Sequence, residues 1–143
     1  MRQTACRARL SNVRQSDLLR RYYDRIDGRP FDRAGEWVDD LAEFFAEGAT
    51  IRAANQPPAD WRAVFLHDGA LARVVDSARH EIVTVIERED DVAAELNVTY
   101  ALKRGGDVTL PGSLFAVIRD GRFTHQHMYV DFAPVFRAAR KED

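Results

Sequence analysis

The sequence predicts an α+β fold, a cone-shaped single domain in which N-terminal helices pack on a strongly curved antiparallel sheet and enclose a pocket. The first half of the chain places apolar residues at helical spacing. The second half consists of long segments rich in β-branched and aromatic residues, separated by short turns. Long strands twist, so such a sheet curves around its helices. A length of 143 residues, with 45% hydrophobic and 31% charged residues, fits one globular domain.

The first predicted helix has apolar residues on one face, at positions 18, 19, 22, 23 and 26. Ser16 is the expected N-cap, since a serine oxygen can accept a hydrogen bond from a free N–H of the first turn. Gly28 and Pro30 are expected to end the helix. Its stretch RYYDRIDG (21–28) sets two tyrosines and two aspartates into a helix that must bury one side.

Further elements are expected before the sheet. A second helix at 37–45 is followed by a short strand at 49–53. Consecutive prolines make 55–60 a loop, because proline continues neither regular element. The pattern becomes helical again at 61–77, with a break near residue 68.

Four strands are predicted in the second half, at 80–88, 92–103, 108–119 and 122–132. The separating segments EDD, RGGD and DG are typical of hairpin turns, so these strands are expected to form an antiparallel meander. The charged segment 137–143 is expected to be a fraying tail.

Composition narrows the function classes. A formal net charge of −2 gives no electrostatic reason to expect nucleic acid or an anionic membrane as a partner, and no apolar run approaches 18 residues. The single cysteine excludes a disulfide framework and a thiolate metal cluster, which fits a reducing cytoplasm and predicts a cytoplasmic location. Residues 1–15 are basic without an apolar centre, so they are expected to be a flexible N-terminal arm. The folded domain is expected at 16–136.

The sequence resembles the SnoaL-like branch of the nuclear-transport-factor-2-like superfamily over 16–136. The segments that carry the resemblance are YYDRIDGRPFD (22–32), LAEFFAEGATI (41–51), RHEIVTVIEREDDVAAELNVTYAL (79–102) and LPGSLFAVIRDGRFTHQHMYVDF (110–132). The resemblance implies the cone-shaped fold and a homodimer. It implies no single activity, because this scaffold serves isomerases, dehydratases, cyclases, epoxide hydrolases and non-catalytic ligand binders.

Three mechanisms of this superfamily lack their residues here. The cavity aspartate that epoxide hydrolases and polyketide cyclases carry on the last strand falls on Met128. The Arg-x-Asp pattern of the epoxide hydrolases falls on Glu95 and Asn97. The base that ketosteroid isomerases keep after the first strand falls in RAAN (52–55), with alanine near the expected place. The resemblance therefore disfavours these three mechanisms.

The pattern of the superfamily's dehydratases is retained. Scytalone dehydratase and a bile-acid dehydratase pair a histidine at the start of the first meander strand with an aspartate late in the first helix, and they add tyrosine hydroxyls. The resemblance places these roles on His80, Asp27 and Tyr22. Relative to scytalone dehydratase, Ile26 replaces a tyrosine, and an apolar residue near Leu102 replaces a second histidine.

These residue types suit the removal of a proton next to a carbonyl group. Histidine has an ordinary pKa near neutrality and can act as general base and acid. A carboxylate on the far ring nitrogen fixes the tautomer and stabilises the imidazolium, and a tyrosine hydroxyl can donate to the enolate oxygen. Structural alternatives stay open: Asp27 can hold the turn, Tyr22 can be a core anchor, and His80 can be a satisfied or exposed histidine.

We therefore predict a cofactor-independent acid–base enzyme, without a metal, that acts on a small hydrophobic, oxygenated metabolite such as a polyketide or terpenoid. The reaction is a dehydration, isomerisation or cyclisation. Besides the three catalytic candidates, the predicted pocket is lined by Ile26, Trp61, Asn97, Thr99, Gln126 and Met128. The alternative is a non-catalytic ligand-binding or regulatory module of the same fold. A third hypothesis is an interaction domain that uses only the outer face of the sheet.

His125, His127, Tyr129 and Asp131 alternate along one predicted strand and therefore share a face. Two histidines at this spacing can ligate zinc. The resemblance instead turns the opposite face of this strand toward the cavity, which favours an interface or surface role for the histidine face. His67 lies in a predicted loop, where it either covers the pocket mouth or is simply exposed.

Overall fold

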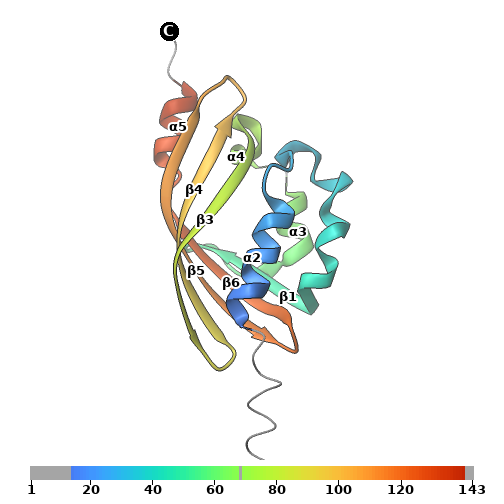
Figure 1. The fold of residues 1–143 in the computed structure, drawn as a ribbon. Helices are drawn as coiled ribbons and strands as arrows, with labels where there is room; N and C mark the ends of the chain where they lie inside the picture. The colour runs from blue at the N-terminus through green and yellow to red at the C-terminus, as the bar shows by residue number, and fades with distance from the viewer. Residues whose placement is uncertain (1–13, 68, 141–143) are drawn as a thin grey trace, which may run out of the picture.

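The structure, a computed structural model, describes residues 14–67 and 69–140 (Figure 1). The predicted arm lies outside the described residues up to position 13, as does the predicted tail from position 141. In chain order the elements are α2 (Gln15–Ile26), the 3-10 helices η1 (Phe31–Glu36) and η2 (Val38–Phe44), β1 (Phe45–Ala53), β2 (Ala59–Asp60), α3 (Trp61–Leu66), α4 (Ala70–Val74), β3 (Val75–Arg88), β4 (Asp91–Leu102), β5 (Asp107–Arg119), β6 (Arg122–Val130) and α5 (Ala133–Arg140).

The six-stranded sheet has the order β2-β1-β6-β5-β4-β3. Strands β3 to β6 form the predicted antiparallel meander. Strand β1 departs from the predicted antiparallel arrangement because it pairs with β6 in parallel, which the long intervening chain permits. The sheet is curved and unclosed, and α2, η1, η2 and α3 form a layer on one side of it (Figure 1). The structure thus confirms the predicted α+β class.

Local irregularities help to bend the strands. The pairing register shifts between Ile82 and Thr84 of β3 and between Val117 and Ile118 of β5. Such bulges bend a strand and increase its twist. Gly112 of β5 lies so close to the neighbouring strand that an added Cβ would lie 2.8 Å from a Val130 methyl group.

The start of α2 differs from the prediction, and its end agrees with it. Arg14 occupies the N-cap position in place of Ser16, and no side chain caps the helix. The Ser16 N–H donates instead to the Glu87 carboxylate of β3, so the strand supplies an acceptor for one of the free N–H groups of the first turn. The helix ends at Ile26, and Gly28 follows with a φ of +77°.

Two predicted boundaries were wrong because strand pairing decides them. The predicted second helix is the 3-10 helix η2 and ends at Phe44, since Phe45 already pairs with Phe123 of β6. Strand β3 begins at Val75, within the predicted third helix, because Val75 pairs with Leu102 of β4.

The described part of the predicted tail is helical, since α5 continues to Arg140. Val135 of this helix is fully buried. The Arg104 guanidinium donates to the Ala139 carbonyl at 3.1 Å, which helps to hold the last turn. The predicted tail therefore begins inside α5, because a buried apolar residue holds this helix in place despite the arginines of its last turn.

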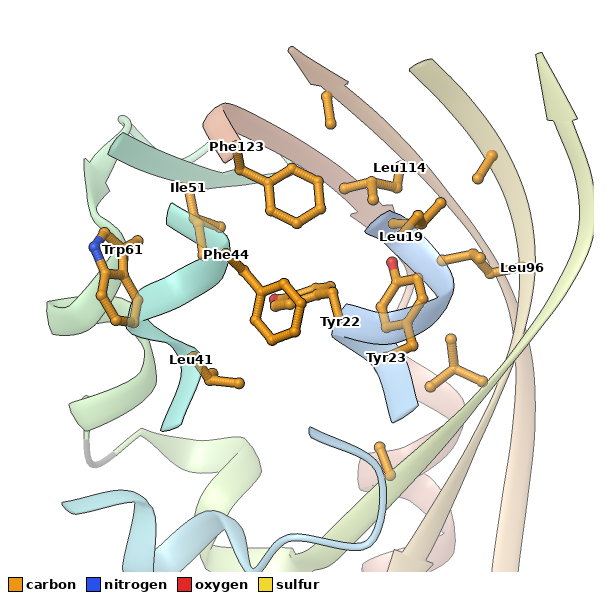
Figure 2. Packing of buried hydrophobic residues seen from close by; sticks show 14 of the residues in the cluster. Leu19, Tyr22, Tyr23, Leu41, Phe44, Ile51, Trp61, Leu96, Leu114 and Phe123 are labelled. Carbon is orange, nitrogen blue, oxygen red and sulfur yellow. The ribbon is translucent and has the colours of Figure 1, made fainter. Parts of the chain in front are cut away.

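Aromatic side chains make the contact between the helix layer and the sheet (Figure 2). Phe44 and Phe123 are fully buried, and the Tyr22 ring lies edge-on to both, at 5.9 and 5.1 Å. Phe45 stacks on Trp61 at 4.4 Å. This packing fixes the distance of α2 from β6 and decides which way its side chains project.

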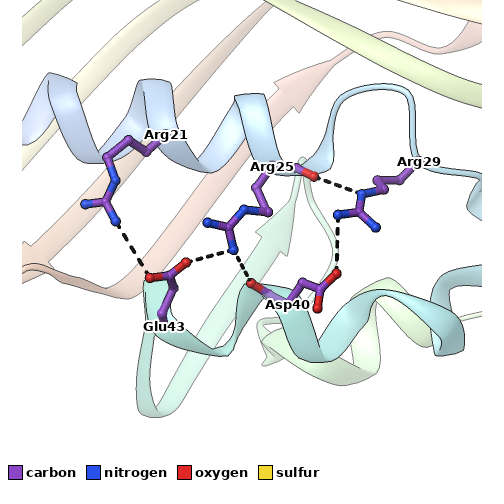
Figure 3. A network of polar contacts seen from close by, with 5 residues as sticks. All are labelled: Arg21, Arg25, Arg29, Asp40 and Glu43. Carbon is purple, nitrogen blue, oxygen red and sulfur yellow. Dashed lines mark hydrogen bonds and ion pairs between the residues drawn. The ribbon is translucent and has the colours of Figure 1, made fainter.

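A row of arginines on the solvent side of α2 joins the helix to η2 (Figure 3). Arg21 and Arg25 pair with the Glu43 carboxylate at 3.7 and 2.7 Å, and Arg29 pairs with Asp40 at 3.2 Å. Exposed ion pairs of this kind contribute little stability each. Their geometry nevertheless orients the C-terminal half of α2, which carries the candidate site.

The buried interior should dominate the free energy of unfolding. Ile118 of β5 is fully buried, whereas Ile86 of β3 is 67% exposed. We expect Ile118→Ala to lower the free energy of unfolding by about 2 to 5 kcal/mol, because it removes buried methyl groups and leaves a cavity. The matched Ile86→Ala change should cost less than about 1 kcal/mol. Urea denaturation of both variants measures the difference, and equal losses would contradict this view of the core.

Candidate functional site

A cavity of about 580 Å³ lies between α2, α3, α4 and the inner face of strands β3 to β6. Its walls are mostly apolar, and none of the described wall residues is Asp, Glu, Lys or Arg. The hydroxyl, amide and imidazole side chains on the wall are those of Tyr22, Tyr23, Gln56, His67, His80, Tyr100, Ser113 and Gln126. A few polar groups in an apolar hollow are typical of a small-molecule site.

Asp27 and His80 are joined by two hydrogen bonds. Asp27 follows the last residue of α2 and has an extended backbone, with φ −61° and ψ 134°. Its Oδ1 lies 2.7 Å from His80 Nδ1, and its Oδ2 accepts the His80 backbone N–H at 3.1 Å. The Gly28 N–H also donates to the Ala78 carbonyl, at 3.0 Å. The end of the helix is thereby tied to the first strand of the meander.

The bond from Asp27 to Nδ1 determines which tautomer the His80 imidazole adopts. An ionised carboxylate can only accept, so Nδ1 carries a hydrogen when it faces Asp27. Nε2 has no hydrogen-bond partner among the described residues. The His80 side chain lines the cavity and is 15% exposed, against 22% for Asp27. In its neutral form the imidazole therefore keeps a lone pair on Nε2 for a molecule in the cavity.

Tyr23 stacks on the His80 ring, with centroids 4.2 Å apart and planes 15° from parallel. No sequence pattern indicated this contact, although Tyr23 belongs to the apolar stripe of α2. Burial raises the pKa of the Tyr23 hydroxyl well above its usual value near 10, and the neighbouring Tyr22, Asp27 and Tyr100 raise it further. The hydroxyl therefore stays protonated and can donate a hydrogen bond.

Tyr22 is both a core anchor and a wall residue, so the two sequence-based readings of it are compatible. Its ring packs edge-on against Phe45 and Phe123, with ring centroids 5.6 and 5.1 Å away. Burial raises the pKa of Tyr22 above 10, and the Gln126 side chain lowers it by a smaller amount. The structure thus brings Tyr22 next to Gln126, whereas the tyrosine that contacts His80 is Tyr23.

Tyr100 of β4 is a further wall residue that the sequence analysis missed. It is buried, its ring lies edge-on to Phe132 at 5.7 Å, and burial raises the pKa of its hydroxyl. Its place in the alternating pattern of β4 was readable from the sequence. The curvature that turns it toward α2 was not.

The predicted substrate-binding residues divide into two groups. Ile26, Gln126 and Met128 line the cavity. Trp61 does not, because its ring is buried against Phe45 in the aromatic core.

Asn97 and Thr99 were also wrong as wall residues. Side chains alternate along a strand, and Leu96, Val98 and Tyr100 are the β4 residues that line the cavity. Thr99 lies on the other face, where its hydroxyl is 2.9 Å from that of Thr109. The apolar residues at the even positions of β4 held this information, because the buried face of a strand is the apolar one.

The histidine face of β6 lies on the outer side of the sheet. His125 Nδ1 is 2.8 Å from Thr50 Oγ1, and His127 Nε2 is 2.8 Å from the Ala54 carbonyl. The Tyr129 hydroxyl lies 3.2 Å from His127 Nδ1. Nowhere in the described ranges do three or more side chains of His, Cys, Asp or Glu gather as metal ligands would.

Two further candidates have separate places. Asp131 accepts the Ala133 N–H at 3.0 Å and thus helps to start α5. His67 is exposed and lines the cavity at its mouth, where an added Cβ on Gly69 would lie 2.9 Å from the His67 ring.

The sequence profile of the SnoaL-like domain matches residues 19–126. The chain belongs to the SnoaL-like family. No curated protein matches this SnoaL-like domain. In the part of the chain that the structure describes, no helix is both long enough and apolar enough to cross a membrane.

Solved structures share the fold of this SnoaL-like domain at low sequence identity. A proposed SnoaL-like polyketide cyclase from Jannaschia sp. CCS1 is 15% identical with a TM-score of 0.67, over 90% of this chain and 92% of that one. AclR, a proposed hydroxylase from Streptomyces galilaeus, is 14% identical with a TM-score of 0.65, over 90% and 96%. TerC, co-crystallised with polyporic acid, is 14% identical with a TM-score of 0.66, over 87% and 97%.

The two hydrogen bonds of Asp27 make a prediction about the His80 tautomer. In Asp27→Asn, the single amide oxygen should still accept the fixed His80 backbone N–H, which leaves the amide NH₂ facing Nδ1. We expect Nδ1 to become an acceptor and the ring hydrogen to move to Nε2. Nitrogen-15 NMR of the imidazole distinguishes the two tautomers. The matched Asp24→Asn change, at an exposed position of the same helix, should leave the tautomer unchanged. An unchanged His80 tautomer in Asp27→Asn would contradict the assignment.

Proposed function

We propose that this SnoaL-like domain is a cofactor-independent acid–base enzyme that dehydrates, isomerises or cyclises a small hydrophobic, oxygenated metabolite, such as a polyketide or terpenoid. The observation that carries the proposal is His80 on the wall of an apolar cavity, with Nδ1 hydrogen-bonded to Asp27 behind it and no described group bonded to Nε2. Such a pair needs no cofactor to move a proton.

In the proposed reaction, His80 Nε2 removes a proton from a carbon next to a carbonyl group. The electron pair of the broken C–H bond moves into the carbonyl, which becomes an enolate. Asp27 stabilises the imidazolium that forms, because it accepts from Nδ1. A protonated tyrosine, with Tyr22 as our candidate, donates to the enolate oxygen. The imidazolium then returns the proton, either to another carbon in an isomerisation or to a departing hydroxyl group in a dehydration.

The apolar walls support a hydrophobic substrate. Transfer of a charged molecule into a cavity without charged wall residues would cost its hydration free energy with little compensation. The similarity to a proposed polyketide cyclase and to a protein co-crystallised with polyporic acid is compatible with this class of metabolite.

A non-catalytic ligand-binding module is the second candidate, and Met128 favours it. This methionine lines the cavity at the position where the superfamily's cyclases carry an aspartate. A binding module would hold the same hydrophobic molecules and return them unchanged.

Hydrogen exchange next to a carbonyl separates the two candidates. In D₂O, we expect the wild-type protein to accelerate deuterium incorporation into members of a panel of neutral cyclic ketones, monitored by NMR. His80→Ala should lower the accelerated rate by about a hundredfold or more, since general-base catalysis contributes at least that factor. The matched His127→Gln change, on the outer face, should have no effect. Equal exchange rates in wild type and His80→Ala would refute the mechanism, and binding without exchange would favour the second candidate.

We also propose that the domain forms a homodimer through the outer face of the sheet, in the cytoplasm. Phe115 and Tyr129 are 52% and 45% exposed there, and their ring centroids lie 6.0 Å apart. Exposed aromatic side chains in contact are typical of interfaces. Sedimentation velocity should show a dimer that Phe115→Glu converts to a monomer. Leu66→Glu, at an exposed position of α3, should leave the dimer intact. A monomeric wild type would contradict this part of the proposal.

A further inference from the structure

Gln126 of β6 is a buried polar side chain with unused hydrogen-bonding capacity. It lines the cavity, is only 1% exposed, and is the only buried residue of the polar and charged classes in the described part of the chain. Its amide nitrogen, Nε2, has no hydrogen-bond partner among the described residues. A buried amide without a partner costs free energy, so its presence requires an explanation.

The neighbouring tyrosine does not satisfy this amide. The Tyr22 hydroxyl is the polar group beside Gln126. An amide nitrogen carries two hydrogens, and one phenolic oxygen can accept at most one of them. At least one N–H therefore remains for an acceptor that enters the cavity.

Gln126 and His80 lie on the wall of the same cavity, each beside one of two adjacent tyrosines of α2. The Tyr22 ring lies 5.2 Å from the Tyr23 ring, which in turn lies 4.2 Å from the His80 ring. The amide beside Tyr22 and the imidazole beside Tyr23 are thus separated by a short row of aromatic rings. One molecule that fills the cavity of about 580 Å³ can contact both groups.

The cavity wall also limits the acceptor. Because none of the described wall residues is charged, a carboxylate or phosphate would lose its hydration without an ionic partner. A carbonyl oxygen is a strong acceptor on an uncharged molecule, and the flanking aromatic rings suit a flat ring system.

We propose that Gln126 is a positioning residue that donates a hydrogen bond from Nε2 to a carbonyl oxygen of a neutral cyclic ketone bound in the cavity. The inference deepens the proposed function, on which it rests for the use of this cavity, because it names the substrate class. The residue acts by holding the ligand, with proton transfer left to His80.

The test compares α-tetralone with tetralin, a pair that differs only in the carbonyl group. Dissociation constants are measured by NMR titration in wild type and in Gln126→Met, which keeps the length of the side chain and removes the donor. The preference for the ketone over the hydrocarbon should be about tenfold greater in wild type than in Gln126→Met, as expected for one hydrogen bond to an otherwise unsatisfied donor. Comparing the ratios cancels the different hydration of the two ligands. The Gln126 side-chain amide resonances should also shift with α-tetralone.

A matched control makes the result specific. Gln56→Met introduces the same chemical change at an exposed position of the cavity mouth and should keep the wild-type preference. The ketone preference is measured without turnover, so it does not depend on proton transfer by His80. Failure of the proposed chemistry and failure of this inference are therefore distinguishable.

Stability of the ligand-free protein gives an independent readout. If Nε2 is unpaired in the ligand-free protein, Gln126→Met should raise the melting temperature by about 3 °C, because the substitution removes an unsatisfied buried donor. A lower melting temperature would show that Gln126 serves the fold and would overturn the inference. So would an equal ketone preference in wild type and Gln126→Met, or the absence of α-tetralone binding to the wild type.

Discussion

The bond between Asp27 and His80 fixes the relation of α2 to the curved sheet, and the rest of the site depends on it. One carboxylate accepts both the backbone and the ring N–H of the same strand residue, so the helix end has one position along β3. With that end fixed, adjacent tyrosines take different surroundings. Tyr22 enters the aromatic core, and Tyr23 covers the imidazole. One turn of helix therefore serves the core and the cavity at once.

The cavity follows from a mismatch between the sheet and its helices. Long strands bend further than a single layer of short helices can fill, and the aromatic packing of Phe44 and Phe123 closes only part of the concave space. The remaining space is walled by apolar side chains with few polar groups. The largely apolar surroundings strengthen any hydrogen bond made inside the cavity and also raise the cost of leaving a group such as Gln126 unpaired.

Asp27 and His80, which the sequence pattern paired, are in contact in the structure, whereas three of the predicted wall residues do not line the cavity. His80 and Asp27 were named from a family resemblance, and the structure brings them within hydrogen-bond distance. Asn97 and Thr99 were predicted to line the pocket, although strand alternation assigns the inner face of β4 to its apolar residues and Tyr100. The error shows that a pocket of this kind is better predicted from the apolar face of each strand, with polar exceptions on that face as the candidates.

The sequence by itself determined that helices precede a four-stranded meander, because this depends on local periodicity and turn residues, and its motifs indicated the family. Only the tertiary structure decided which tyrosine stacks on His80, where β3 begins, and that Gln126 is buried with a free donor. Each of these depends on how far the sheet bends and how the helix layer rests on it. Curvature and packing arise from contacts between residues distant in the chain, and no local pattern encodes them.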